Sequence, residues 1–194
     1  MTGKVCVVTG ASSGIGYATA MALARMGATV ALVCRNRERA EDARAAIVAT
    51  SGNAAVEIFL ADLSSLAAIR HLAHELLARY PQIHVLVNNA GILNRKRMTT
   101  IDGIEAVFAV NHLAYFLLSQ LLLERLQASA PQGLQVRMLN DLPAADGGWR
   151  LPDLAWGAEA WAPLRLTVPP GALPSPGALL ALLRPLSEKP LIVK

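Results

Sequence analysis

The chain has 194 residues, enough for about one domain, of which 54% are hydrophobic and only 16% are charged. This composition excludes a disordered chain and provides for a real hydrophobic core. The net charge is only +4, and the one short basic run, at residues 95–97, is too small to indicate a nucleic-acid partner.

Apolar strand-like runs and helical repeats alternate along the first 130 residues. The strands are continuous apolar runs, which are typical of a parallel sheet covered by helices on both faces. Right-handed crossovers then predict a doubly wound, Rossmann-type α/β fold. The predicted elements, in chain order, are strand 5–9, helix 14–26, strand 29–34, helix 38–50 with Asn36 as its N-cap, strand 56–60, a helix over 66–76 capped by Ser64 or Ser65 and ending before Pro81, strand 83–87 and helix 103–128.

The distribution of proline changes near residue 131. Residues 1–130 contain one proline, Pro81, whereas residues 131–194 contain ten. We predict a fifth strand at 134–139 and a short helix at 178–184, and the prolines leave no window for another long helix or central strand. The sequence therefore predicts a domain over 1–130 and an atypical, proline-rich tail over 131–194, for which partial disorder is one alternative. The sheet would be incomplete on its C-terminal side.

The sequence shows neither a membrane span nor a signal peptide. Its best apolar stretch, 113–123, is interrupted by two polar residues, and a span needs roughly 20 apolar residues. An apolar strand follows Lys4 directly and leaves no room for a signal peptide. Cys6 and Cys34 lie in apolar strands and are interpreted as reduced core residues, with no metal site. We expect a cytoplasmic protein.

A glycine-rich turn joins the first predicted strand to the first helix. It reads Thr-Gly-Ala-Ser-Ser-Gly-Ile-Gly over residues 9–16. Glycines allow a sharp turn and a close ligand, and the helix start offers free N–H groups, so the expected ligand is a pyrophosphate. Residue 17 is a tyrosine, which excludes a phosphate loop with a lysine at that position. The candidate binding residues here are Gly10, Ser12, Ser13, Gly14, Ile15 and Gly16.

The end of the second strand bears on which dinucleotide would fit. An acidic residue there would bind the adenosine ribose hydroxyls and repel a 2′-phosphate. The sequence instead has Arg35 and Asn36, and the guanidinium of Arg35 suits a phosphate. These two residues favour NADP(H) over NAD(H). The alternative is that Arg35 is a solvated loop arginine.

Polar residues also follow the third and fourth strands. Asp62 could accept a hydrogen bond from an adenine amino group, or it could cap the following helix. The fourth strand is followed by Asn-Asn-Ala-Gly over 88–91, where the amides could bridge strand ends and Gly91 would admit a cofactor. A plain Asx turn is the alternative. The further candidate cofactor-binding residues are Asp62, Leu63, Asn89, Ala90 and Gly91.

Together, these motifs resemble those of the short-chain dehydrogenase/reductase family over residues 4–128. The turn at 9–16 is similar to the family's TGxxxGxG, Asp62 to its adenine-side Asp, and 88–91 to its NNAG motif. Asn111 is similar to the helix Asn of the family's catalytic tetrad. Cys34-Arg35 and Val-Asn-His-Leu at 110–113 resemble the retinol-dehydrogenase-like branch, which usually prefers NADP(H).

The resemblance implies hydride transfer between a nicotinamide and a small-molecule alcohol or carbonyl substrate. The family uses a Tyr as acid/base, a Lys four residues later, a Ser and the helix Asn. A phenol with a pKa of about 10 needs a nearby cation to act as a base at neutral pH. Tyr17, Tyr80 and Tyr115 are the only tyrosines, and none is followed by Lys at that spacing. Only Asn111 of the tetrad matches, so we predict impaired catalysis.

Three interpretations stay open for the whole chain. The first is an NADP(H)-dependent oxidoreductase by descent, impaired in catalysis. The second is a non-catalytic dinucleotide-binding or regulatory module. The third is a truncated or frameshifted product, because the tail has the composition of GC-rich DNA read out of frame. The apolar residues at 103–128 predict a helix buried on two sides. The family resemblance implies that this helix is the candidate contact of a homodimer.

Overall fold

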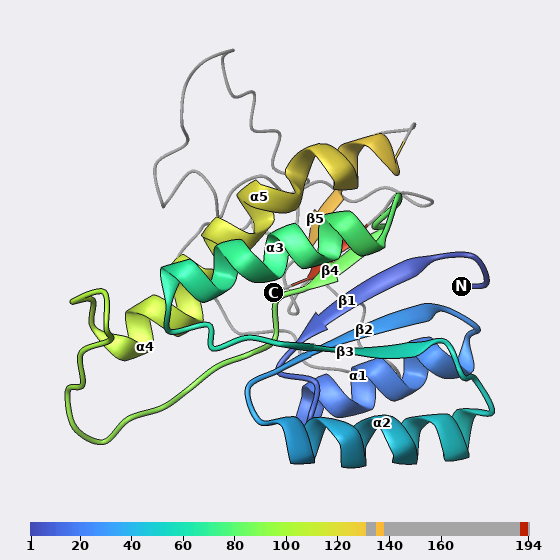
Figure 1. Cartoon of the computed structure of the whole chain (residues 1–194), viewed down its shortest axis with the longest axis horizontal. Coiled ribbons are helices and arrows are strands. Elements are labelled where there is room, and N and C mark those ends of the chain that lie inside the picture. Colours follow the sequence, from blue (N-terminus) through green and yellow to red (C-terminus); the bar gives the residue numbers. More distant parts are fainter. Residues whose placement is uncertain (131–134, 138–190, 194) are drawn as a thin grey trace, which may run out of the picture.

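A parallel sheet runs through the centre of the molecule (Figure 1). The computed structural model describes residues 1–130 and the backbone of two short strands at 135–137 and 191–193. The six described strands are in the order β3-β2-β1-β4-β6-β5, and all pair in parallel. Their bounds are β1 Val5–Thr9, β2 Thr29–Cys34, β3 Val56–Leu60, β4 Val85–Val87, β5 Gln135–Arg137 and β6 Leu191–Val193.

Helices cover both faces of this sheet, which confirms the doubly wound α/β fold (Figure 1). Helices α1 (Gly14–Arg25) and α2 (Arg37–Ser51) pack on one face, and α3 (Leu66–Arg79) and α5 (Ala114–Ala128) pack on the other. The chain builds outward from β1 to β2 and β3, then returns to place β4 on the other side of β1. The strand order therefore reverses between β1 and β4, and such a switch point is where ligands bind in open α/β sheets.

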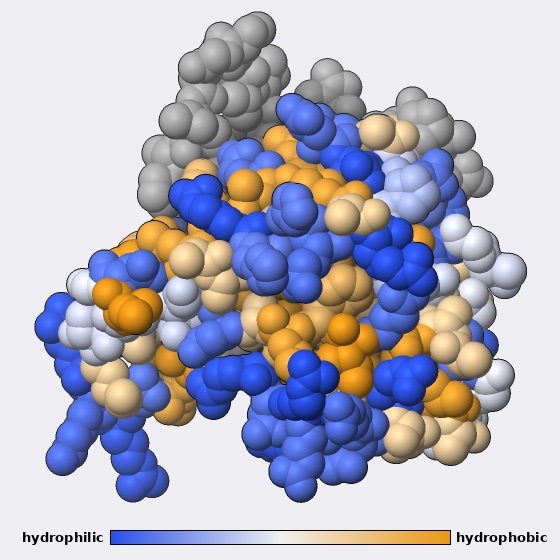
Figure 2. All heavy atoms as spheres, viewed as in Figure 1, coloured by the Kyte–Doolittle hydropathy of each residue, from blue (hydrophilic) through white to orange (hydrophobic). Residues whose placement is uncertain are grey.

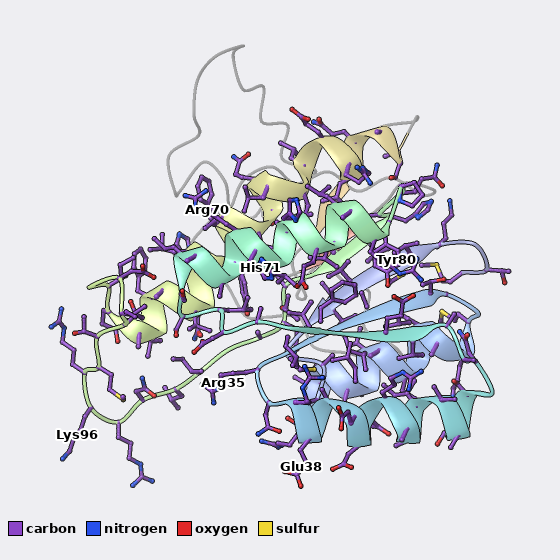
Figure 3. All side chains as sticks on the ribbon, in the orientation of Figure 1. Arg35, Glu38, Arg70, His71, Tyr80 and Lys96 are labelled. Atoms are coloured by element: carbon purple, nitrogen blue, oxygen red, sulfur yellow. The ribbon has the colours of Figure 1, made fainter. Side chains whose placement is uncertain are left out.

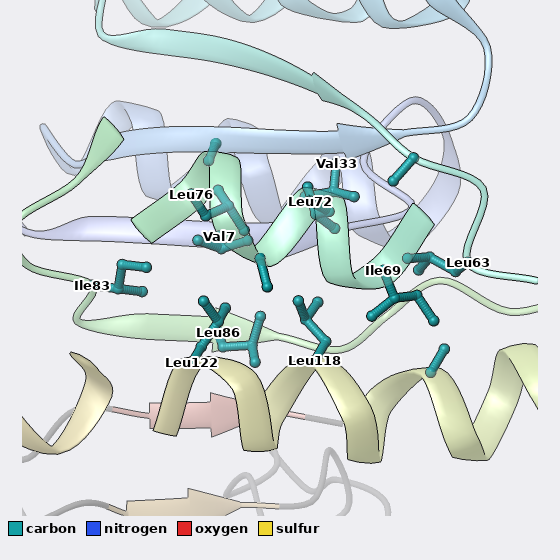
Figure 4. Packing of buried hydrophobic residues seen from close by; sticks show 14 of the residues in the cluster. Val7, Val33, Leu63, Ile69, Leu72, Leu76, Ile83, Leu86, Leu118 and Leu122 are labelled. Carbon is teal, nitrogen blue, oxygen red and sulfur yellow. The ribbon is translucent and has the colours of Figure 1, made fainter. Parts of the chain in front are cut away.

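Alternation along the strands separates the core into two clusters. In β1, Val7 points toward α3 and α5, whereas Cys6 and Val8 point toward α1 and α2. Figure 4 shows Val7 and Leu86 of the sheet packed with leucines of the two covering helices. Burial of each such side chain contributes roughly 1.5–3 kcal/mol to the free energy of unfolding. Cys6 and Cys34 are buried free thiols, as predicted.

Three helix ends carry the capping residues that the sequence predicts. The Asn36 side chain accepts a hydrogen bond from the Arg39 N–H and caps α2. The Ser65 hydroxyl does the same for α3 with the Ala68 N–H. Gly27 ends α1 with a φ of 80°, a left-handed conformation that glycine adopts readily.

The predicted helix at 103–128 differs from the structure in two respects. Helix begins only at α4 (Ala106–Phe108), because Gly103 has a φ of 75° and the Glu105 carboxylate accepts hydrogen bonds from the first helical N–H groups. It continues through a π-helical segment, Ala109–Leu113, into α5. The fully buried residues of α5 form one stripe facing α3: Ala114, Leu118, Leu122 and Leu126. Within residues 1–130 the other apolar residues of α5 are at most half-buried, so full burial on two sides is not found there.

This long helix also bears on the expected absence of a membrane span. Ala106–Ala128 has 23 residues and a mean hydropathy of 1.7, so by length and composition it could cross a membrane. The expectation that no span occurs is therefore not confirmed. Core helices of soluble proteins pass the same test, and the buried stripe of α5 packs against α3.

The last two described strands test the predictions for the tail. β5 at Gln135–Arg137 confirms a strand within 134–139. The expectation of no further central strand is wrong, because β6 lies between β4 and β5. Leu191–Val193 is short, apolar and free of proline, so it pairs on both sides without losing a ladder hydrogen bond. The predicted helix at 178–184 lies outside the described residues.

Candidate functional site

The loops after β1 and β4 meet closely at the carboxyl edge of the sheet, at the left end of the strands in Figure 1. A Cβ atom on Gly10 would lie 2.8 Å from the Cα of Ala90. A Cβ atom on Gly16 would overlap the Gly10 carbonyl oxygen and the Asn89 side-chain amide. Gly10 and Gly16 are therefore needed to let the glycine turn pack directly against the loop after β4.

A small hydrogen-bond network holds these two loops together. The fully buried Thr9 hydroxyl accepts hydrogen bonds from the N–H groups of Asn89 (2.9 Å) and Ala90 (3.0 Å), and it donates to the Val87 carbonyl. The Asn89 side-chain amide donates back to the Thr9 carbonyl at 3.0 Å. This confirms that an amide bridges the strand ends. The role of Thr9, by contrast, is visible only in the structure.

The N-terminus of α1 is the open part of this edge. Ser13 is the N-cap residue, but its side chain accepts no hydrogen bond from the helix, and no acidic residue lies in the first turn. Gly14 has a φ of 57°, and a Cβ atom there would meet nothing within 4 Å. Ile15 is 66% exposed. Unpaired N–H groups and the positive end of the helix dipole thus face an open space, which suits a phosphate or pyrophosphate.

Ser12 connects this turn to the end of β2. The Cys34 thiol interacts with the Ser12 side chain and the Ala11 backbone, although burial is the larger effect and raises the pKa of Cys34. Arg35 follows directly and is exposed, projecting from the end of β2 (Figure 3). No ion pair of Arg35 occurs within the described part of the chain. Its guanidinium is therefore available for an anionic ligand at this edge.

Asp62 and Leu63 follow β3. The Asp62 carboxylate accepts a hydrogen bond from the Ser64 N–H at 2.9 Å, and Asp62 is exposed. The alternative that Asp62 caps the following helix is wrong, because Ser65 occupies the N-cap position of α3. The Leu63 side chain belongs to the hydrophobic core on the α3 side.

Asn111 is hydrogen-bonded to Ile92, the first residue of the loop that follows the NNAG motif. Its side chain accepts from the Ile92 N–H and donates to the Ile92 carbonyl, both at 2.9 Å. It lies in the π-helical segment and against Gly91, at 3.6 Å from where a Cβ atom would be. π-helical turns are frequent at functional sites. Asn111 thus joins the candidate site, held by a loop rather than by its own helix.

Burial opposes a catalytic role for two of the three tyrosines. The Tyr115 hydroxyl donates to the Ala90 carbonyl, and burial raises the pKa of Tyr115 to about 12. Burial also raises the pKa of Tyr80, which lies at the C-terminal end of α3, away from the carboxyl edge. Tyr17 lies within α1. A general base at neutral pH requires a lowered phenol pKa, so neither Tyr115 nor Tyr80 fits that role.

Asn88 and Ser119 are further polar residues whose pairing the sequence did not reveal. The Asn88 amide donates to the Ser119 hydroxyl at 3.1 Å, from β4 to α5. Asn88 is only 3% exposed, and its side-chain oxygen has no hydrogen-bond partner among the described residues. No local pattern indicates this pair, because 31 residues separate its members.

Comparisons with known proteins agree with the geometry of this edge. The short chain dehydrogenase family matches residues 4–138. Retinol dehydrogenase 12 of Mus musculus is 47% identical over 129 residues, which cover 66% of this chain and 41% of that protein. Retinol dehydrogenase 13 of Homo sapiens is 41% identical over 154 residues, which cover 79% of this chain and 46% of that protein. The chain thus spans less than half the length of these relatives.

Solved structures show the same fold. A metagenomic short-chain oxidoreductase in complex with NADP superposes with a TM-score of 0.61 at 35% identity, covering 75% of this chain and 67% of that chain. An alcohol dehydrogenase from the archaeon Thermococcus sibiricus, complexed with 5-hydroxy-NADP, has a TM-score of 0.59 at 31% identity, covering 71% of this chain and 58% of that chain. With its glycine turn, its NNAG motif and its Rossmann-type sheet, this chain belongs to the short-chain dehydrogenase family, and it is similar to retinol dehydrogenases.

Proposed function

We propose that residues 1–130 bind NADP(H) as the cofactor domain of a short-chain oxidoreductase, and that this chain by itself is impaired in catalysis. The main support is the N-terminus of α1, which no side chain within residues 1–130 caps and which faces open space at Gly14. The capped N-termini of α2 and α3 lack this opening. A pyrophosphate would receive hydrogen bonds from the turn at residues 12–16.

Arg35 supports a preference for NADP(H) over NAD(H). It is exposed beside the glycine turn and carries a positive charge where a carboxylate would bind ribose hydroxyls. The Asn36 side chain offers a ligand only its amide N–H groups in full, because its oxygen already accepts the hydrogen bond that caps α2. Complexes of structural neighbours with NADP and 5-hydroxy-NADP agree with this preference.

Impaired catalysis follows from the proton-transfer groups of this chain. A bound nicotinamide would supply or accept a hydride, so the protein must supply or accept a proton at the substrate oxygen. Asn111 positions the Ile92 backbone and cannot exchange protons. The family's Tyr-x-x-x-Lys pair does not occur in the 194 residues. A small alcohol or carbonyl substrate therefore requires groups beyond those we describe.

The test is a fluorescence titration of the full chain with NADPH and with NADH. We expect saturable NADPH binding, which Arg35→Ala weakens by about 10- to 100-fold, because a charge-assisted contact contributes about 1.5–3 kcal/mol. Arg25→Ala, at the far end of α1, is the matched control and should leave both affinities unchanged. Equal losses for NADPH and NADH would reject the preference. Absence of saturable binding would leave the unstable, frameshifted product as the remaining interpretation.

A carbonyl panel separates an impaired enzyme from an active one. We expect no NADPH consumption above background. Turnover that Asn111→Ala abolishes would show that this chain is catalytically complete. Binding without turnover agrees with the impaired enzyme and with the non-catalytic module alike.

Location and assembly remain predictions. We propose a cytoplasmic protein without a membrane span, whose helix at 103–128 forms the contact of a homodimer. The half-buried outer face of α5 supports such a contact. Sedimentation velocity of the full chain tests the dimer: a single monomeric species at micromolar concentration would reject it.

A further inference from the structure

The loop between the NNAG motif and α4, residues 92–105, carries the strongest surface feature outside the cofactor site. Arg95, Lys96 and Arg97 are consecutive and exposed, and none forms an ion pair with the described residues. The loop extends away from the sheet at the left of the molecule, and Lys96 points outward from it (Figures 1 and 3).

The two acidic residues of this loop are engaged elsewhere. The Asp102 carboxylate accepts a hydrogen bond from the Leu66 N–H at the start of α3. The Glu105 carboxylate accepts from the Phe108 and Val107 N–H groups, and these bonds lower the pKa of Glu105. Both charges therefore face helix N-termini, where the helix dipole partly offsets them. The outward face of the loop is left positive.

Large aliphatic side chains flank the basic run. Leu93 is 92% exposed and Ile101 is 89% exposed, and Met98 is also exposed. Single exposed apolar residues are ordinary, but here three lie within nine positions around three cations. In the space-filling view, apolar atoms emerge among hydrophilic ones over this end of the molecule (Figure 2).

We propose that the 92–105 loop docks on an anionic membrane surface. Leu93, Met98 and Ile101 would enter the headgroup boundary, while the three cations bind lipid phosphates and carboxylates. Bases of a nucleic acid stack on aromatic side chains, and this loop contains none, so a lipid surface fits it better. Asn111 holds Ile92 at the root of the loop, so docking would turn the carboxyl edge of the sheet toward the lipid.

The proposal is tested by co-sedimentation of the full chain with vesicles, in the absence of any nucleotide. We expect binding to vesicles of phosphatidylcholine and phosphatidylserine at a ratio of about 7:3 and none to phosphatidylcholine alone. Binding should weaken from 50 to 300 mM salt, because the Debye length falls below about 10 Å. Each basic residue near a charged membrane contributes about a factor of five, so Arg95→Gln/Arg97→Gln should lower partitioning roughly 25-fold.

Two further variants make the test specific. Leu93→Ser/Ile101→Ser keeps the charge and should lower partitioning by at least about tenfold, because two aliphatic side chains would no longer bury apolar surface at the headgroup boundary. Arg25→Gln/Arg70→Gln removes the same charge from exposed positions in α1 and α3 and should bind like the wild type. All substitutions are at exposed residues, and unchanged melting curves would verify folding.

Three results would overturn the proposal. Equal loss in the Arg25→Gln/Arg70→Gln control would mean that overall charge, not the loop, drives binding. Undiminished binding of Leu93→Ser/Ile101→Ser, with competition by single-stranded DNA, would identify a general polyanion surface. Equal binding to vesicles with and without phosphatidylserine would remove the role of the basic run.

Discussion

The two edges of the sheet use polar groups in opposite ways. At the amino edge, long-range hydrogen bonds close the structure: the His84 ring accepts from the Val5 N–H, and the Ser129 hydroxyl accepts from the Ile83 N–H. Arg125 donates to the carbonyls of Leu77 and Tyr80. At the carboxyl edge, the Thr9 network ties the loops together but leaves the start of α1 open.

This difference shows how one sheet divides stability and binding between its ends. Buried polar groups need partners, so the groups of the amino edge that bond to one another gain stability but offer nothing to a ligand. The carboxyl edge pairs Thr9 with Asn89 and Ala90 and keeps the helix N–H groups of the glycine turn free. The following predictions test this division, from the largest effect to the smallest.

Gly16→Ala should be the most damaging change. The added methyl group would overlap the Gly10 carbonyl and the Asn89 amide, which belong to a rigid junction. We expect a loss of about 3 kcal/mol in the free energy of unfolding, together with loss of NADPH binding. Gly14→Ala is the matched control: it meets no atom within 4 Å and should cost only about 1 kcal/mol for its positive φ. Urea denaturation measures both, and equal losses would contradict the close-packed junction.

Thr9→Val should cost about 2 kcal/mol. The isosteric valine keeps the volume but leaves the N–H groups of Asn89 and Ala90 without their acceptor in a buried position. Thr9→Ser retains the hydroxyl and should lose clearly less. The midpoint of urea denaturation compares the two variants, and an equal shift would show that the methyl group, not the network, is what matters.

His84 makes the amino edge sensitive to pH. Burial and nearby Lys4 lower the pKa of His84 below 6.5, so the unfolded chain binds the proton more tightly than the folded one. The free energy of unfolding should therefore fall as pH drops below about 6.5, by about 1 kcal/mol, as protonation removes the acceptor for the Val5 N–H. His84→Gln, which accepts without titrating, should flatten this dependence between pH 7 and 5. An unchanged slope would mean that other groups cause it.

Helix caps give the smallest and most direct contrast. Ser65→Ala removes a side-chain cap from α3 and should cost about 1 kcal/mol, whereas Ser13→Ala should cost less than about 0.5 kcal/mol, because Ser13 caps nothing. Thermal melts measure the difference. In NADPH titrations only the Ser13 variant should change. If Ser13→Ala lowered the stability of the protein and left the NADPH affinity unchanged, Ser13 would be a cap of α1 and not part of an open anion site.

Much of the fold could be predicted because its signals are local. Continuous apolar runs, the glycine turn and the caps at Asn36 and Ser65 act within a few residues, and the structure confirms them. The start of the long helix was misplaced because Thr99 and Glu105 form a bridge around the turn at Gly103, a contact outside the helical pattern. β6 was missed because three residues carry too little periodic signal to predict a strand.

The amino-acid sequence by itself determined the order of strands and helices over residues 1–130, the glycine turn and the polar residues placed at strand ends. Only the tertiary structure decided which of these groups pair with one another: Thr9 with Asn89 and Ala90, Asn111 with Ile92, and His84 with Val5. The reason is physical. Thr9 and Asn89 are 80 residues apart, and only the docking of β4 beside β1 brings them within hydrogen-bond distance while leaving the start of α1 open.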